Sequence, residues 1–112
     1  MSEPLGVSEP GREQLDALSV PALIEFGAGW CGHCQAAQPL LAQALAAFPT
    51  LLHYRIEDGP GRRLGRTYKV KLWPTLIFLD QGKEVGRLVR PASGQEITQE
   101  LQRLLLTQKP VV

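Results

Sequence analysis

The two cysteines of the chain, Cys31 and Cys34, are separated by two residues and lie between an apolar segment and a helical pattern. A Cys-x-x-Cys pair where a strand passes into a helix is typical of a redox-active dithiol. The first turn of a helix carries partial positive charge and free N–H groups, so it favours a thiolate on the leading sulfur. Helix geometry also exposes the leading residue and buries the one a turn later. We therefore expect a reactive Cys31 and a shielded Cys34 that can close a disulfide with it.

The hydrophobic pattern predicts an α/β fold in which helices cover both faces of a mixed central sheet. Residues 22–26 are apolar toward both faces, as in a central strand of a covered sheet. Further strands are expected at 52–56, 75–79 and 84–89. Helices are expected at 9–19, at 31–48 with Pro39 inside, around Leu64 and Tyr68, and after the capping-box spacing of residues 93–96. No strand is expected before residue 22.

The length of 112 residues fits one domain, residues 1–112, in which residues 1–8 and 108–112 are expected to be loose. A formal net charge of +1 argues against nucleic acid as the main partner. The first six residues contain neither a basic segment nor an apolar stretch. We therefore expect no signal peptide, no membrane association and a cytoplasmic protein. A periplasmic protein that has lost its leader would give the same pattern.

Two short segments resemble the thioredoxin family. Residues 30–34, Trp-Cys-Gly-His-Cys, with Pro39 after them, resemble that family's active site, and residues 73–75, Trp-Pro-Thr, resemble a second segment of it. The inner dipeptide Gly32-His33 is more similar to the disulfide-isomerase branch than to thioredoxin proper, which usually carries Gly-Pro. The resemblance extends over residues 15–107. It implies a thioredoxin fold, here with a first strand that is short or missing.

The resemblance implies a thiol–disulfide oxidoreductase that acts on protein disulfides, first of all as a reductase. Cys31 would be the nucleophile and Cys34 the resolving thiol. The implied partners are disulfide-containing protein substrates and a recycling reductase such as a thioredoxin reductase. The chemistry requires no metal and no organic cofactor. A zinc half-site with His33 or His53 is the competing interpretation, but two cysteines provide too few ligands for a closed tetrahedral site.

Glu25 lies on the apolar strand, six residues before Cys31. The family places an acid at this position, where it helps to deprotonate the resolving thiol. A structural acid, or an acid that faces water from an edge strand, is the alternative. An approximate alignment puts His53 where thioredoxin usually has a lysine facing this acid. His53 either pairs with Glu25 or points at water.

The resemblance also implies a cis peptide bond between Trp73 and Pro74, packed beside the dithiol. The expected substrate-binding residues are Trp30, Gly32, His33, Trp73 and Pro74. The backbone N–H and C=O of Trp73 would remain free to pair with an extended client segment. Arg90 stands near a position where the family usually has glycine, and its charge would narrow or repolarise the docking surface.

Two other functions compete with a reductase. A cationic His33 would stabilise the Cys31 thiolate and make the protein a stronger oxidant, which favours an oxidase or isomerase in an oxidising compartment; His33 as a solvent-exposed spacer would have little effect. The second competitor is a non-catalytic module that uses the fold as a peptide-docking surface.

Overall fold

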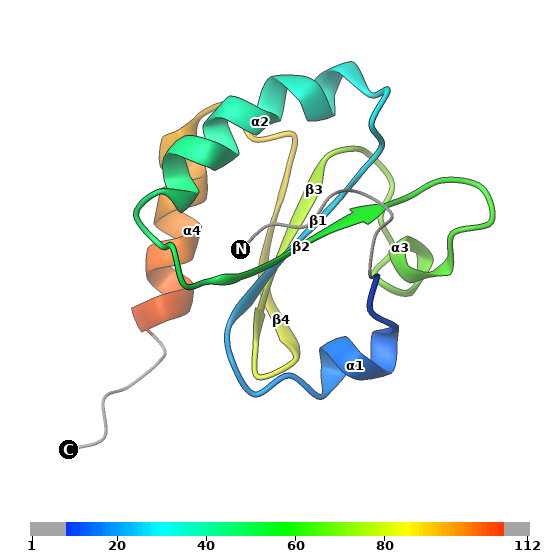
Figure 1. Cartoon of the computed structure of the whole chain (residues 1–112), viewed down its shortest axis with the longest axis horizontal. Helices are drawn as coiled ribbons and strands as arrows, with labels where there is room; N and C mark the ends of the chain where they lie inside the picture. The colour runs from blue at the N-terminus through cyan, green and yellow to red at the C-terminus, as the bar shows by residue number, and fades with distance from the viewer. Residues whose placement is uncertain (1–8, 107–112) are drawn as a thin grey trace.

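Four strands form one mixed sheet in a computed structural model that describes residues 9–106 (Figure 1). The strands are β1 (Ala22–Gly27), β2 (Leu52–Glu57), β3 (Thr75–Asp80) and β4 (Lys83–Val89). Their order across the sheet is β2-β1-β3-β4. The β1–β2 pair is parallel, whereas the β1–β3 and β3–β4 pairs are antiparallel. The expected mixed sheet is therefore confirmed, and no strand precedes β1 in residues 9–21.

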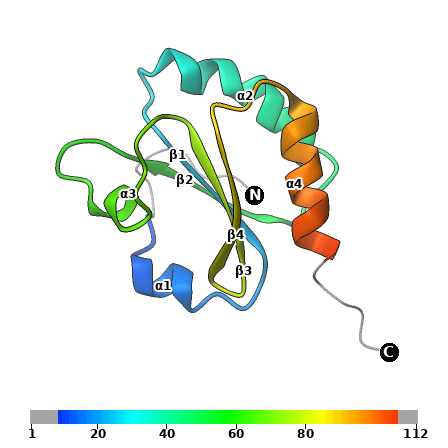
Figure 2. The same cartoon turned by 180° about the vertical axis from the view of Figure 1, so that it is seen from behind.

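Helices cover both faces of this sheet because its two central strands are apolar toward both sides. On one face α2 (Gly32–Leu45) and α4 (Gly94–Leu106) share a core with Leu23, Leu76 and Phe78. On the other face lie α1 (Arg12–Asp16) and α3 (Arg63–Thr67), and Leu15 of α1 joins the core with Phe26. Figure 2 shows the two layers from behind.

Several helix ends differ from the expected ones. Helix α2 ends at Leu45 instead of residue 48, because the N–H groups of Ala47 and Phe48 bond to carbonyls three residues earlier, at 3.4 and 2.9 Å. The chain thus tightens before Pro49. Helix α1 is shorter than expected and begins only after Gly11. The capping box before α4 is confirmed: Ser93 Oγ accepts from Glu96 N at 3.3 Å, and Glu96 Oε2 accepts from Ser93 N at 3.0 Å.

The sheet brings two distant segments together. Thr75, at the start of β3, pairs with Phe26, near the end of β1. The residues just before Thr75 therefore lie beside the residues that lead from β1 into α2. The segments expected to be loose, 1–8 and 108–112, lie outside the described residues. Within the described part of the chain, no helix is long and apolar enough to cross a membrane.

Candidate active site

Cys31 is the N-cap of α2, and the backbone of its first turn surrounds its sulfur. Its extended backbone, with φ −78° and ψ 120°, lets Sγ accept a hydrogen bond from Cys34 N at 3.3 Å. Its own N–H donates to Ala28 O at 3.1 Å. Both cysteines are present as free thiols. The expected junction of strand and helix therefore positions one sulfur as a capping acceptor and the other inside the first turn.

The two thiols differ in acidity. Burial raises the pKa of Cys31, but hydrogen bonds from the Cys34 thiol and from the N–H groups of Cys34 and His33, together with the charge of Arg90, outweigh it and bring that pKa below its ordinary value. Burial, followed by the hydrogen bond to Cys31, raises the pKa of Cys34 to about 12. Cys31 is therefore the thiol that ionises more readily, and Cys34 keeps its proton at neutral pH.

Cys34 is buried as expected, but the expectation that Cys31 is exposed is wrong. Cys31 is 6% exposed and Cys34 is 5% exposed. Both pack with Ala28, and the Trp73 ring covers this small cluster. Burial raises the pKa of both thiols, and only at Cys31 do hydrogen bonds and the charge of Arg90 outweigh it.

Gly27, at the end of β1, provides the space for the second sulfur. A Cβ atom at this position would lie 2.6 Å from Cys34 Sγ, closer than two such atoms can approach. Any side chain at residue 27 would have to displace the sulfur. The sequence pattern gave no sign of this requirement, because it depends on the distance between a strand and a helix.

The peptide bond between Trp73 and Pro74 is cis, as expected. The indole N–H of Trp73 donates to Asp58 Oδ2 at 2.9 Å, and its ring meets the Trp30 ring edge-on, with centroids 5.4 Å apart. Trp30 itself is 77% exposed. The two tryptophans thus flank the dithiol, and Trp30 presents apolar surface to solvent. Asp58, which orients Trp73, was not anticipated.

The Trp73 carbonyl is not free for a client segment, contrary to expectation. It accepts a hydrogen bond of 2.7 Å from Arg90 Nε, while Arg90 N donates to Pro74 O at 3.0 Å. Arg90 thus borders the cis peptide bond with both its backbone and its side chain. That its charge narrows or repolarises the docking surface stays a prediction.

Glu25 is 1% exposed and lies under α2 among three polar side chains. Gln38 Nε2 donates to Glu25 Oε2 at 2.7 Å. His53 Nε2 and Arg55 Nε lie 3.3 and 3.4 Å from Glu25 Oε1. The expected alternative of an acid that faces water from an edge strand is therefore wrong, because the buried carboxylate is surrounded by donor groups.

His53 pairs with Glu25, and its exposure of 4% contradicts the alternative that it points at water. The residue in register with Glu25 is Arg55, two positions further along β2. Alternate residues of a strand share one face, so both side chains reach the carboxylate. The approximate alignment therefore identified the right face of β2 but missed Arg55.

Gln38 connects this buried cluster to the dithiol. Its amide nitrogen also lies 3.4 Å from Cys34 O, and the charge of Glu25 is among the causes that raise the pKa of Cys34. Cys34 and Gln38 are four residues apart on one helix face. That spacing is a signal in the sequence that could have identified Gln38.

Gly32 and His33 form the exposed part of the first turn between the two cysteines. A Cβ atom at Gly32 would meet nothing within 4 Å. The exposed position of His33 agrees with a spacer, while the effect of its charge stays a prediction. Among residues 9–106, no three His, Cys, Asp or Glu side chains are grouped as a metal site requires.

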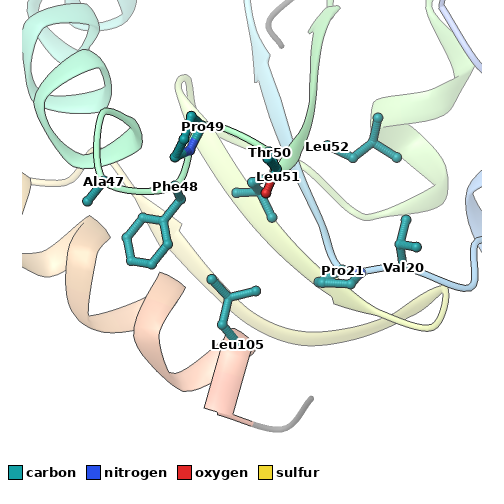
Figure 3. A pocket seen from close by; sticks show the side chains of 9 residues that line it. All are labelled: Val20, Pro21, Ala47, Phe48, Pro49, Thr50, Leu51, Leu52 and Leu105. Carbon is teal, nitrogen blue, oxygen red and sulfur yellow. The ribbon is translucent and has the colours of Figure 1, made fainter. Parts of the chain in front are cut away.

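A separate apolar hollow of about 410 Å³ lies at the opposite end of β1 (Figure 3). Val20 and Pro21, just before the strand, line it together with Phe48 and Leu105. Its lining residues include no thiol, carboxylate, imidazole or amine side chain. The chemistry-bearing residues are instead those at the Gly27 end of the strand.

Known proteins are similar to this chain in sequence and in structure. The family model described as Thioredoxin matches residues 11–103. Thioredoxin C-3 of Corynebacterium nephridii is 32% identical over 104 residues, which cover 92% of this chain and 69% of that protein. Reduced thioredoxin 2 of Pseudomonas aeruginosa PAO1 is 50% identical, with a TM-score of 0.83 and coverage of 96% of this chain and 99% of that one.

Other relatives match over a shorter range. An H-type thioredoxin of Fagopyrum esculentum is 30% identical over 67 residues, which cover 60% of this chain and 58% of that protein. The match to thioredoxin H-type 1 of Nicotiana tabacum covers 62% of that protein. The chain thus spans less than two thirds of these two relatives. The family model, the bacterial relative and the solved structure agree with the observed fold, and this chain belongs to the thioredoxin family.

Proposed function

We propose that this protein is a thiol–disulfide oxidoreductase that reduces protein disulfides through Cys31 and Cys34. One observation carries the proposal: the pKa of Cys31 is lowered while burial and the hydrogen bond to Cys31 raise that of Cys34 to about 12. An attacking thiolate and a resolving thiol that keeps its proton until it is needed are what a two-step exchange requires.

In the first step, Cys31 thiolate attacks one sulfur of the client disulfide. A bond forms between Cys31 and the client, and the other client sulfur leaves as a thiolate. In the second step, Cys34 loses its proton and attacks Cys31 Sγ, which releases the second client sulfur. The protein ends with a disulfide between Cys31 and Cys34, and the client has gained two electrons and two protons.

Glu25 is proposed as the base that helps to remove the proton from Cys34. Its carboxylate is buried, it is held by Gln38 at 2.7 Å, and its charge acts on the Cys34 thiol. Proton transfer would pass directly or through one water molecule. The exchange itself uses sulfur and proton chemistry only. A reductase partner, such as a thioredoxin reductase, would return the dithiol to its reduced form.

Insulin reduction tests the proposed activity. The wild-type protein, with a reductant that recycles it, should precipitate the insulin B chain, whereas Cys31→Ser should be inactive. Cys34→Ser should accumulate a mixed disulfide with its client, because the second step is blocked. A wild-type protein that leaves insulin intact would favour the non-catalytic binding module.

An oxidase or isomerase is the second candidate, because His33 lies between the two cysteines at the exposed start of α2. A cation there would stabilise the thiolate and therefore the reduced form. The reduction potential separates the two directions of electron flow, since reductants of this family lie near −270 mV and disulfide isomerases near −180 mV. His33→Gln, which keeps the backbone N–H, should lower the potential by tens of millivolts if the charge matters.

A further inference from the structure

Arg90 directly follows β4 and borders the dithiol. Its backbone N–H donates to Pro74 O at 3.0 Å, which holds it beside the cis peptide bond. Its charge is close enough to Cys31 to contribute to the lowered pKa of that thiol. A client that presents a disulfide to Cys31 therefore approaches this side chain.

The backbone gives no reason for an arginine at this position. Arg90 has φ 50°, in the left-handed region that glycine adopts readily and other residues adopt rarely. The turn after β4 would form more easily with glycine. The side chain must therefore be explained by what it contacts.

Within the described part of the chain, the Arg90 guanidinium makes one hydrogen bond, and its other N–H groups are available to bind a ligand. Nε donates to Trp73 O at 2.7 Å, which anchors the group at that atom. Arg90 is exposed, and within residues 9–106 its two Nη groups have no hydrogen-bond or carboxylate partner. Arg87 differs, because its Nη2 donates to both Glu84 and Tyr68 O. The two Nη groups therefore remain available beside the cis peptide bond between Trp73 and Pro74.

We propose that Arg90 is a specificity-determining residue that binds a carboxylate of the client next to the disulfide under attack. A guanidinium fork binds a carboxylate through two parallel hydrogen bonds. This inference rests on the proposed function and names its substrate class: disulfides with Asp or Glu adjacent to the reactive cysteine. Trp30 and Trp73 provide the apolar contacts of the same surface.

Electrostatics also favours a client carboxylate at Arg90. A client carboxylate near Cys31 is repelled by the thiolate, and this repulsion disfavours acidic clients. The charge of Arg90 offsets it at the place where it arises. Without Arg90, the acidic client should therefore become the poorer substrate of a matched pair.

The test compares two synthetic peptides that are closed by one disulfide and differ only in Glu or Gln beside each cysteine. Second-order rate constants are measured in single turnover with pre-reduced protein. For each protein we take the rate constant with the Glu peptide divided by that with the Gln peptide. The wild-type value of this ratio is then divided by the Arg90→Gly value. In this quotient, differences in the reactivity of the two peptides and in the thiolate content of the two proteins cancel. We expect this quotient to be about five at low ionic strength and to approach one at high salt.

Two variants serve as controls. Arg90→Lys keeps the charge but loses the fork, so its Glu preference should lie between those of wild type and Arg90→Gly. Lys83→Ser removes the same charge at the other end of β4 and should keep the wild-type ratio. Equal ratios in wild type and Arg90→Gly would overturn the inference. An equally faster reduction of both peptides by Arg90→Gly would also overturn the inference, because Arg90 would then only obstruct the site.

A binding measurement separates this inference from the proposed function. If the protein reduces neither the peptides nor insulin, the proposed function fails. The dissociation constants of the Glu and Gln peptides, with serine in place of cysteine, are then measured on Cys31→Ser/Cys34→Ser protein by NMR titration. Tighter binding of the Glu peptide that is lost in Arg90→Gly supports the carboxylate site, and equal constants overturn it.

Discussion

Cys31 and Cys34 have almost equal exposed fractions, and burial raises the pKa of both thiols, so the opposite direction at Cys31 comes from its hydrogen bonds and from the charge of Arg90. Cys31 caps α2, and its sulfur accepts from the first turn. Cys34 lies within that turn, and its thiol donates toward Cys31, which lowers one pKa and raises the other. The pair thus shares one proton, and each thiol shifts the pKa of its partner.

Cys34→Ala should therefore raise the pKa of Cys31. The substitution removes the thiol donor but keeps the backbone N–H of residue 34. A hydrogen bond to a charged group contributes about 1.5 kcal/mol, which corresponds to about one pKa unit. The pH dependence of iodoacetamide alkylation measures the change. Cys34→Ser is the control, since its hydroxyl can still donate, and equal midpoints in the two variants would contradict the shared hydrogen bond.

Gly27→Ala should slow resolution of the mixed disulfide more than its formation. A methyl group at residue 27 would displace Cys34 Sγ and leave Cys31 in place. We expect a loss of about tenfold or more in the second step, as small misplacements of reacting atoms often cause. Gly29→Ala is the matched control, because a Cβ there meets nothing within 4 Å. Rapid mixing with a client peptide gives both rates, and identical rates in the two variants would refute the steric argument.

At the scale of elements, β1, β2 and α2 meet around one buried carboxylate. Glu25 comes from the central strand, Arg55 lies in register on β2, and Gln38 reaches down from α2. A buried charge without partners would strongly destabilise the fold, so these three elements depend on one another for the stability of the site. The same contacts hold the carboxylate near the resolving thiol.

Arg55→Met should lower the free energy of unfolding by about 1–3 kcal/mol, because Glu25 loses one of its donor neighbours. In a Glu25→Gln background the same substitution should cost much less, since no buried charge remains. Urea denaturation of the four proteins gives the coupling energy. Arg63→Met, on the exposed surface of α3, should change stability by less than about 0.5 kcal/mol. A coupling energy of zero would mean that Arg55 and Glu25 do not interact.

For the whole molecule, local patterns predicted the order of strands and helices and the dithiol, because periodicity and the Cys-x-x-Cys spacing are local features. The position of α2 on β1 and the register of β2 depend on distances across the fold. Arg55, Asp58 and the packing of Gly27 against Cys34 were missed for that reason, whereas the helical spacing of Gln38 from Cys34 was a local signal that was overlooked. The use of the Trp73 carbonyl by Arg90 was missed too, since it joins residues seventeen positions apart.

The two thiols also give the stability of the whole reduced protein a pH dependence. An ordinary thiol has a pKa of about 8.5, which applies to both cysteines in the unfolded chain. The lowered pKa of Cys31 contributes stability that is present above this value and is lost as the pH falls through the lowered pKa. The pKa of about 12 for Cys34 acts in the opposite sense: its contribution is present below 8.5 and is lost as the pH rises toward 12.

Above about pH 8.5, therefore, the unfolded chain releases a proton from Cys34 that the folded protein keeps, and stability falls by up to about 1.4 kcal/mol per pH unit. Other groups titrate in this range, so the test compares wild type with Cys34→Ser, in which that proton does not titrate. Urea denaturation under reducing conditions gives the difference in unfolding free energy at each pH. This difference should be constant near neutrality. As the pH rises from 8.5, the unfolding free energy of the wild type should fall relative to that of Cys34→Ser. A difference that stays constant up to pH 10.5 would mean that Cys34 ionises as easily in the folded protein as in the unfolded chain. The fold would then not hold the proton that the second step of the exchange must remove.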